Sequence, residues 1–358
     1  MSDFLSAQTR TETDSLGSVE IPSSAYWGVH TARAHENFPI ARRPISVYPD
    51  FVRAFACVKQ AAARANLEIG ALDEQSATLI DRACEEVKTG MLIDQFVVDV
   101  IQGGAGTSTN MNANEVIANL ALEILGRKRG EYAHLHPNNH VNLSQSTNDV
   151  YPTAIRLTLI TMGRRLIAAM GRLCAALEVK GREFAHIIKI GRTQLQDAVP
   201  MTLGQEFAGF AATIREDIAI IARLSELLLE VNLGGTAIGT RVNTPDGYAE
   251  RAVAELALVS GLKVTLAGDL VEASSDTGAY VTFSGVLKRI AVKLSKICND
   301  LRLLSSGPRS GFNEIRLPAM QAGSSIMPGK VNPVIPEVVN QVAFQVIGND
   351  LTVTMAAE

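Results

Sequence analysis

A regular alternation of three- and four-residue steps between apolar residues most constrains how this chain folds. It runs through three long segments and is unbroken between residues 280 and 304. The apolar residues of that third segment are Tyr280, Phe283, Leu287, Ile290, Leu294, Ile297, Leu301 and Leu304. An average spacing of 3.5 residues places these apolar side chains along one face of a helix. Such a face forms the seam between long helices that pack side by side. The sequence therefore predicts a mainly α fold built around a long-helix bundle.

The other two seams lie earlier in the chain. The first has Ile155, Leu159, Met162, Leu166, Met170, Leu173 and Leu177, and the second has Leu203, Phe207, Phe210, Ile214, Ile218 and Ile221. Pro200 and the pair Thr202 and Gln205 precede the second seam, and Thr-x-x-Gln is a capping box that starts a helix.

Shorter helices are predicted before the seams, in residues 51–68, 73–88 and 112–125. The first fifty residues contain four prolines and read as extended segments and turns. We therefore expect two domains, a smaller mixed but mostly helical one over residues 1–145 and the central bundle over residues 146–358. A helical pattern that begins near Pro336 has no stop signal before the last residues, VTMAAE, so we expect a truncated bundle without a C-terminal domain.

Composition narrows the class of protein. Hydrophobic residues make up 47% and charged residues 20% of the 358, which favours a chain that covers surface in subunit contacts. The net charge of −4 gives no electrostatic footprint for nucleic acid or for a membrane surface. The chain has no signal peptide or membrane-spanning run, and its four cysteines form no C-x-x-C pair. These features favour a cytoplasmic protein.

Four loops rich in glycine, hydroxyls or asparagine lie beside predicted helices, at residues 103–115, 144–154, 191–207 and 323–337. A helix N-terminus offers unpaired N–H groups and partial positive charge, which attract a carboxylate. Several such loops, together with Lys330, suit a small dicarboxylate. The alternative is that Ser, Thr and Asn in these loops only cap helices.

The loop at 323–337 is the least consistent with simple capping, because its serines precede Met-Pro-Gly-Lys where no helix pattern has begun. Two other features are weaker candidates. His134, His136 and His140 cluster without a cysteine or carboxylate ligand nearby, which disfavours a metal site. The glycines of residues 234–239 follow a predicted helix rather than a strand, so they do not predict a dinucleotide site.

These segments resemble the aspartase/fumarase superfamily. GSSIMPGKVNP resembles its signature, and GGAGTSTNMNANEV, SQSTNDVYPT and GRTQLQDAVPMTLGQEF each resemble one of its conserved blocks. LLLEVNLGGTAIGT and KICNDLRLLSSGPRSGFNEIRLP resemble the aspartase branch. Many members carry histidine where this chain has Gln194, whereas some aspartases carry glutamine.

The resemblance implies that ammonium is eliminated from L-aspartate to give fumarate, reversibly, through a carbanion. It implies Ser324 as the base, with Thr107, Ser146, Thr147 and Ser325 on the reacting carboxylate. It also implies Thr193, Lys330 and Asn332 on the other carboxylate, and Asn148 with Gln194 on the amino group. Arg33 is a further candidate.

The family further implies a homotetramer with active sites shared between chains. It implies no prosthetic group, and it leaves open activation by a divalent cation such as magnesium. Two alternatives remain at this point: a class II fumarate hydratase or another lyase of the superfamily, and a non-catalytic assembly subunit.

Overall fold

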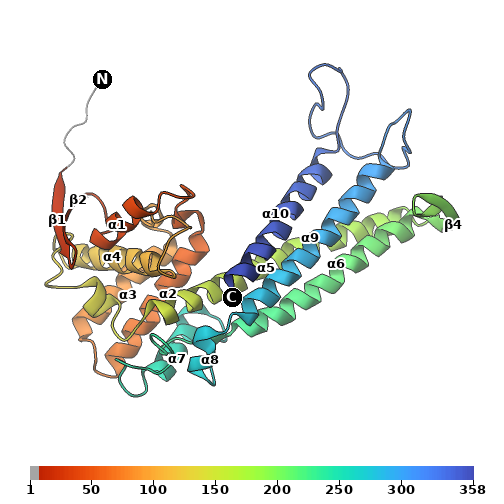
Figure 1. The fold of residues 1–358 in the computed structure, drawn as a ribbon. Coiled ribbons are helices and arrows are strands. Elements are labelled where there is room, and N and C mark those ends of the chain that lie inside the picture. The colour runs from red at the N-terminus through yellow and green to blue at the C-terminus, as the bar shows by residue number, and fades with distance from the viewer. Residues whose placement is uncertain (1–7) are drawn as a thin grey trace, which may run out of the picture. The chain divides into compact units, whose positions relative to one another are not determined.

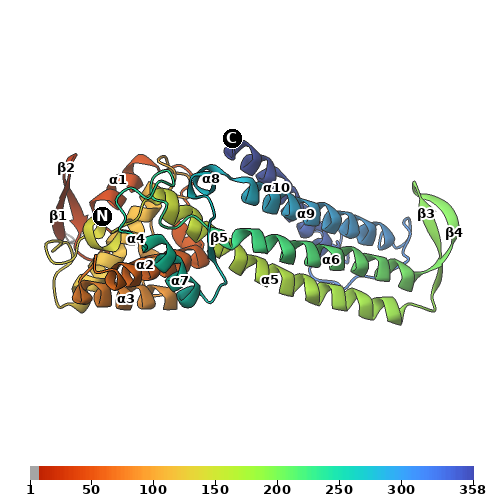
Figure 2. The same ribbon diagram turned by 90° about the horizontal axis from the view of Figure 1, so that it is seen from below.

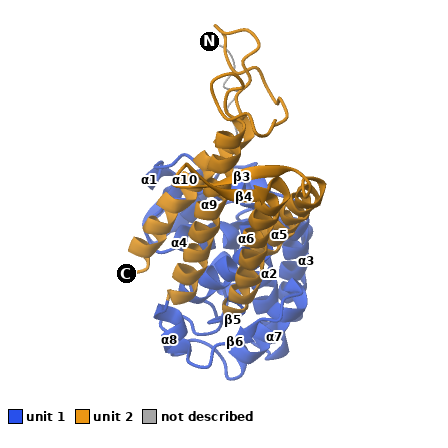
Figure 3. Cartoon of the chain, turned by 90° about the vertical axis from the view of Figure 1, so that its right-hand side faces the viewer, with its two compact units in different colours: residues 1–162, 228–276 blue, residues 163–227, 277–358 orange. Residues whose placement is uncertain are grey.

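The computed structural model describes residues 8–358, and its contacts divide the chain into two compact units (Figure 3). Unit 1 extends to Met162 and resumes over Leu228–Asp276, whereas unit 2 is formed by Gly163–Leu227 and Thr277–Glu358. Helices dominate both units, which confirms the predicted mainly α fold. The two domains predicted from the sequence, residues 1–145 and 146–358, are a different division and stay a prediction.

Unit 1 begins with an antiparallel hairpin of β1 (Thr9–Asp14) and β2 (Gly17–Pro22), followed by α1 (Val29–Asn37). The expectation of only extended segments and turns in the first fifty residues was wrong for α1. The carboxylate of Glu115 accepts hydrogen bonds from the backbone N–H groups of Gly28, His30 and Thr31, at 2.8, 2.9 and 3.2 Å. These amides would otherwise lack partners, so a residue far along the chain stabilises the start of α1.

The core of unit 1 forms around α2 (Pro49–Glu68), which packs against α3 (Glu74–Thr89) and α7 (Tyr248–Ser260). Phe55, Val58, Ala61 and Ala65 of α2 are fully buried. Phe51 and Phe55 pack edge to face at 5.1 Å, and Phe51 meets Tyr151 at 5.5 Å, both between ring centroids. The contacts of α7 with α2 explain why residues 228–276 belong to this unit.

The helix α4 (Thr107–Ile124) packs against α1 and α3 and carries buried polar residues. Asn110, Asn112, Asn114, Glu115 and Asn119 are at most 2% exposed. Burying such groups is costly unless they find hydrogen-bond partners. Asn112 donates to the Gln95 carbonyl and Asn119 to the Tyr26 carbonyl, so α4 ties distant loops to the core.

Shorter elements complete unit 1. These are η1 (Ile45–Val47), η2 (Ile93–Gln95), the π-helical η3 (Pro137–Val141), the parallel strands β5 (Glu230–Val231) and β6 (Thr265–Leu266), and α8 (Leu270–Ser275). The helix α5 (Thr147–Glu183) begins in unit 1 and continues in unit 2, and η4 (Glu226–Leu228) spans a unit boundary.

Unit 2 is built from the later part of α5, α6 (Leu203–Ser225), α9 (Gly278–Leu304) and α10 (Val334–Ala356), which lie alongside one another (Figures 1 and 2). The hairpin β3 (Ile188–Thr193) and β4 (Gln196–Thr202) connects α5 to α6. The predicted capping box at the start of α6 is confirmed, because the Thr202 and Gln205 side chains each bond the other's backbone N–H.

The seams of unit 2 are buried to different degrees. In α6, all predicted seam residues except Ile218 are buried. In α9, Phe283, Ile290, Ile297 and Leu304 are buried, while the alternate row of Tyr280, Leu287, Leu294 and Leu301 is only half-buried. One row of the α9 seam therefore packs fully within this chain. Among the described residues, no helix combines the length and the apolar character needed to cross a membrane.

We predict that Gly204→Ala destabilises unit 2, because Gly204 packs directly on the end of α5. A Cβ there would collide with the Gly181 carbonyl oxygen and lie 2.7 Å from Ala185 backbone atoms. Overpacking of this kind costs about 1–3 kcal/mol. The matched control is Gly209→Ala on the exposed side of α6, which meets nothing within 4 Å. That change should stabilise the helix by about 0.5–1 kcal/mol. Urea denaturation measures both, and a Gly204→Ala protein as stable as the parent would contradict the packing.

Candidate active site

The first predicted loop enters α4 through a turn of glycines. Gly104 and Gly106 have φ values of 90° and 92°, and Gly106 is the N-cap of α4. Thr107 begins the helix, and its hydroxyl donates to the Gly104 carbonyl at 2.8 Å. Thr107, Ser108, Thr109 and Asn110 therefore lie in the first turn rather than ahead of the helix, which corrects the prediction. Glycine adopts this left-handed conformation readily, so the turn can end directly before Thr107.

The second loop ends at the start of α5, where side chains and backbone bond one another. Ser146 Oγ accepts from the Asn148 N–H at 3.2 Å, while Asp149 Oδ1 accepts from the Ser146 N–H at 3.0 Å. This reciprocal pattern stabilises a helix N-terminus. Ser146 and Thr147 are half-buried and Asn148 is exposed. The Asn148 amide donates to the Ala237 carbonyl at 2.8 Å.

Asp149 connects this helix start to the glycine-containing segment 234–239. Its Oδ2 accepts from the backbone N–H groups of Gly234 and Thr236, each at 3.0 Å. Burial raises the pKa of Asp149 to about 7, and the backbone hydrogen bonds and the Lys59 charge oppose that rise. The sequence placed a helix before these glycines. The structure has the short strand β5 instead, so that prediction was wrong, and two of the segment's amides serve Asp149.

A fully buried lysine, which the sequence did not single out, lies behind both loops. Lys59 Nζ of α2 donates to Asn110 Oδ1 at 2.7 Å, and to Asn142 Oδ1 and Gln145 Oε1 at 2.9 Å. Burial lowers its pKa to about 7, although the charge of Asp149 acts in the other direction. The sequence did contain a signal for this buried lysine, because Lys59 stands in the middle of the apolar helical stretch CVKQAAA.

The third predicted loop is the β3–β4 hairpin, not an irregular loop. Thr193 pairs with Gln196 across the turn. Gln194 and Leu195 occupy the turn with φ values of 52° and 63°. Two successive left-handed residues match the twist of a two-residue hairpin. Thr193 and Gln194 are both exposed at this tip.

Ion pairs bind this hairpin to the segment that follows α9. Arg192 pairs with Glu314, and its guanidinium lies 4.3 Å from the centre of the Phe312 ring. Lys189 contacts Glu206 at 2.6 Å and Glu314 at 3.1 Å. The hydrogen bond from Arg192 lowers the pKa of Glu314 below its ordinary value. These contacts hold the hairpin and residues 312–314 together within unit 2.

The fourth loop, residues 323–332, closes on itself. The Gly323 N–H donates to the Lys330 carbonyl at 2.8 Å, and the Asn332 amide donates to the Gly323 carbonyl at 3.3 Å. Ser324 Oγ accepts from the N–H groups of Ile326 and Met327 at 3.2 and 3.0 Å. Ser324 is half-buried, while Ser325 and Lys330 are exposed. A hydroxyl oxygen that accepts two N–H bonds is favoured as an anion.

Within unit 1, the structure brings Thr147 to Asn110, whose Nδ2 donates to Thr147 Oγ1 at 3.1 Å. Within unit 2, Ser324, Ser325, Lys330 and Asn332 share one loop, and Thr193 and Gln194 share the hairpin tip. Arg33 is engaged elsewhere in unit 1, where it forms a two-pronged pair with Asp14 at 2.8 Å.

The histidine cluster has a local structural use. His136 Nδ1 accepts from the N–H groups of Asn138 and Asn139, and His140 Nδ1 accepts from the His136 N–H at 2.9 Å. These bonds cap the π-helical turn η3. Among residues 8–358, no three His, Cys, Asp or Glu side chains gather as a metal site would require.

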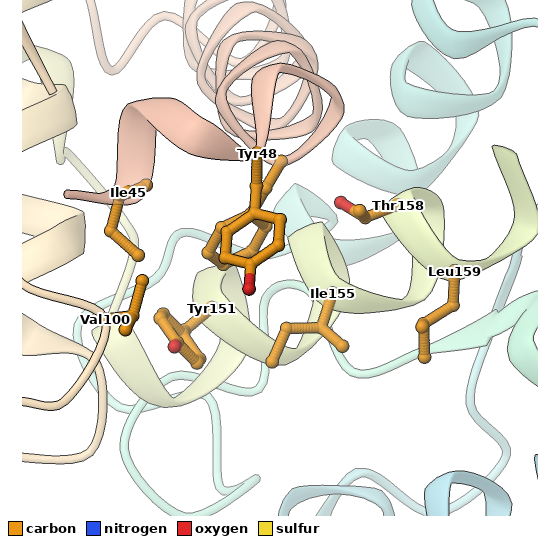
Figure 4. A pocket seen from close by; sticks show the side chains of 8 residues that line it. Ile45, Tyr48, Val100, Tyr151, Ile155, Thr158 and Leu159 are labelled. Atoms are coloured by element: carbon orange, nitrogen blue, oxygen red, sulfur yellow. The ribbon is translucent and has the colours of Figure 1, made fainter. Parts of the chain in front are cut away.

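Two hollows in unit 1 lie apart from the predicted residues. One, of about 300 Å³, is lined mainly by apolar groups of Ile45, Tyr48, Phe51, Val100, Tyr151, Ile155 and Leu159 (Figure 4). Such a lining offers a dicarboxylate few hydrogen-bond donors. The other, of about 540 Å³, is exposed and lined by both arginine and aspartate side chains. Neither includes a residue of the candidate site.

The chain is similar to known lyases over nearly its whole length. The sequence profile of a lyase family matches residues 17–348. An aspartate ammonia-lyase of Pseudomonas fluorescens is 63% identical over 353 residues, which cover 98% of this chain and 74% of the relative. An aspartate ammonia-lyase of Escherichia coli strain K12 is 59% identical over 355 residues, 99% of this chain and 74% of the relative.

Solved structures of lyases are also similar to this chain. A "fumarate lyase:delta crystallin" of Brucella melitensis, bound to cobalt, is 64% identical with a TM-score of 0.95 and covers 98% of this chain and 76% of its own. A class II fumarase of Schistosoma mansoni is 35% identical, with a TM-score of 0.93. The match covers 98% of this chain and 76% of the fumarase chain.

We predict that Glu314→Gln lowers the stability of unit 2 at neutral pH by about 1 kcal/mol, because it removes the negative partner of Arg192 and Lys189. The folded pKa of Glu314 lies below its ordinary value of 4.5. Its contribution is therefore complete above pH 4.5 and is lost as the pH falls through the folded pKa. Denaturation at several pH values checks this.

Glu183→Gln is the matched control, because Glu183 forms only an exposed pair with Lys180. It should change stability little at any pH. A difference between Glu314→Gln and the parent that stays constant from pH 7 to pH 3 would exclude the carboxylate as its source.

Proposed function

The chain belongs to the aspartase/fumarase family of lyases, and from that premise we propose that it eliminates ammonium from L-aspartate to give fumarate, reversibly. Its identity to aspartate ammonia-lyases is 59–63%, whereas its identity to the class II fumarase is 35%. This difference favours a carbon–nitrogen lyase over a fumarate hydratase.

The reaction requires removal of a weakly acidic proton from the carbon beside the distal carboxylate. The C–H electron pair moves into that carboxylate and gives an enolate-like dianion. The pair then returns to form the C=C bond, while the C–N pair leaves with the nitrogen. The proton removed from carbon balances the one that converts ammonia to ammonium, so no redox cofactor is needed. Donors aimed at the developing charge each typically matter by about 10²–10³ in rate.

Ser324 is the proposed base, and one observation carries this assignment. A serine hydroxyl is a poor base unless its anion is stabilised. Two backbone N–H groups, from Ile326 and Met327, already point at Ser324 Oγ at 3.2 and 3.0 Å. Such bonds favour the alkoxide over the alcohol. Gly323 lets the loop close, because a Cβ there would lie 2.7 Å from the Asn332 nitrogen.

The remaining roles follow the family resemblance. Thr107, Ser146, Thr147 and Ser325 bind the reacting carboxylate; Thr193, Lys330 and Asn332 bind the other carboxylate; and Asn148 and Gln194 bind the amino group. These side chains are exposed or half-buried, so ligand access supports the assignment. Lys330 supplies a full positive charge for the other carboxylate, and the hydroxyls and amides supply directional donors.

The active protein is proposed to be a cytoplasmic homotetramer that shares its active sites between chains. Exposed apolar residues on α10 support subunit contacts: Ile335, Val338, Val342, Phe344, Leu351 and Met355. The half-buried row of the α9 seam supports the same conclusion. Cell fractionation would test the location. We propose no prosthetic group, and titration with magnesium tests activation by a divalent cation.

Assays with L-aspartate and with L-malate, each followed by fumarate formation, test the proposed activity. We expect turnover of L-aspartate. Turnover of L-malate alone would replace the proposal with a fumarate hydratase, and turnover of neither by a folded tetramer would favour a non-catalytic subunit.

We predict that Ser324→Ala lowers kcat for L-aspartate by at least about 100-fold, the typical contribution of a general base. Thermal unfolding should change little, because the loop is exposed. Ser18→Ala, at an exposed position of β2, is the control and should keep the parent rate. Near-parental turnover by Ser324→Ala would assign proton removal to another group.

We predict a solution mass near four times the 38.3 kDa of one chain. Burial of apolar α9 and α10 surface drives this association. Val342→Glu should weaken it, since a charge in an apolar interface is costly, whereas Glu337→Gln in the same helix should not. Light scattering measures the mass, and a monomer at all concentrations would contradict shared active sites.

A further inference from the structure

The charge of the buried Lys59 determines the direction of the hydrogen bond between Asn110 and Thr147 in unit 1. The ammonium group of Lys59 has three N–H donors and no acceptor. Its partners are the side-chain oxygens of Asn110, Asn142 and Gln145, at 2.7–2.9 Å. Each of these amides must therefore turn its oxygen toward Lys59 and its nitrogen away.

For Asn110, the outward nitrogen faces two oxygens. It donates to Asn142 Oδ1 and to Thr147 Oγ1, each at 3.1 Å. Because an amide nitrogen only donates, Thr147 Oγ1 acts here as an acceptor. The hydroxyl hydrogen of Thr147 is then not needed for this contact, and Thr147 is half-buried rather than enclosed. Its hydrogen is available to a group outside the network.

We propose that Lys59 and Asn110 are positioning residues that make the Thr147 hydroxyl a hydrogen-bond donor to the substrate carboxylate. The inference rests on the proposed function, in which Thr147 binds the reacting carboxylate. This relay of hydrogen bonds runs from the Lys59 ammonium to the Asn110 amide, and from that amide to the Thr147 hydroxyl. It orients a donor before substrate arrives, and a preorganised donor costs no reorganisation when charge develops.

The surroundings of the relay reinforce this direction. Asn142 Oδ1 accepts from Lys59, from Asn110 and, at 3.2 Å, from Asn114. Gln145 Nε2 donates to the carbonyls of Val141 and Leu143. Reversing any one amide would leave donors facing the ammonium, which is strongly unfavourable in a buried site. The orientation of Asn110 is therefore determined by the charge of Lys59.

Asn110→Asp is the informative variant. The carboxylate keeps an oxygen against Lys59 and adds an opposite charge. This attraction offsets the loss of the bond from Asn110 to Asn142 Oδ1 at 3.1 Å, so the fold should remain about as stable as the parent. It has no N–H, however, so the Thr147 hydroxyl must now donate inward. Asn142→Asp is the matched comparison, because it places the same charge beside Lys59 and leaves the Asn110–Thr147 bond intact. It loses only the long bond from Asn142 to the Gln145 carbonyl, at 3.2 Å.

The whole protein is measured for thermal stability, for kcat and KM with L-aspartate, and for binding of succinate, a dicarboxylate without an amino group. We expect Asn110→Asp to lower kcat/KM about 10- to 100-fold and to weaken succinate binding, without a lower Tm, since the Thr147 hydroxyl no longer donates to the ligand carboxylate. Asn142→Asp should lose much less of both. Lys59→Met, which removes the charge, should weaken succinate binding and also lower the Tm.

Two results would overturn the relay. One is parental kcat/KM and succinate binding in Asn110→Asp. The other is an equal loss in Asn110→Asp and Asn142→Asp, which would assign the effect to charge rather than to hydrogen-bond direction. A parent protein that binds succinate but does not consume L-aspartate would refute the proposed function, and the succinate arm would still decide the relay. A parent protein that neither binds succinate nor consumes L-aspartate would refute both the relay and the proposed function.

Discussion

The ammonium of Lys59 is the constraint on which the polar interior of unit 1 depends. A buried charge without partners costs several kcal/mol, so oxygens from α4 and from the segment before α5 must surround it. Asp149 imposes the converse requirement and gathers three backbone N–H groups around its carboxylate. The two groups together fix the first turns of α4 and α5. The carboxylate clamp that we propose on these turns would need that rigidity, because misplaced donors lose most of their value.

The loop that carries the proposed base, residues 323–332, is organised differently. Residues 323–332 are mostly exposed, and hydrogen bonds within the loop define its shape. As the proposed base, Ser324 would need backbone N–H groups rather than a buried ion pair, since its oxygen would become negative and then neutral again within each turnover. Weak, neutral donors can favour an alkoxide without holding it permanently. The chemistry proposed for each part therefore matches the strength of its local interactions.

The sequence-based predictions failed where a distant contact or an unusual local backbone conformation determines the structure. The long helices and the capping box of α6 were predicted correctly, because periodicity and capping act over a few residues. The seam on α5 is only partly buried within this chain, since Met162 and Leu173 are exposed. The helix α1 was missed, because its first amides are held by Glu115, more than eighty positions away. The hairpin tip at Gln194 was predicted as a loop, since neither Gln194 nor Leu195 is typical of left-handed turns. The start of α4 was misplaced by five residues, because the helix begins at Thr107, directly after the left-handed Gly106.

The sequence by itself determined that this chain forms long packed helices and that it carries the motifs of the aspartase/fumarase family. Local periodicity and residue types specify both. Only the tertiary structure decided which polar residues support those motifs. Lys59, Asn110, Asn142 and Asp149 come from three separated stretches, and nothing in their spacing indicates that they meet. They meet because a buried charge is tolerated only where the fold brings enough partners to it, and that is a property of the packed unit rather than of any one segment.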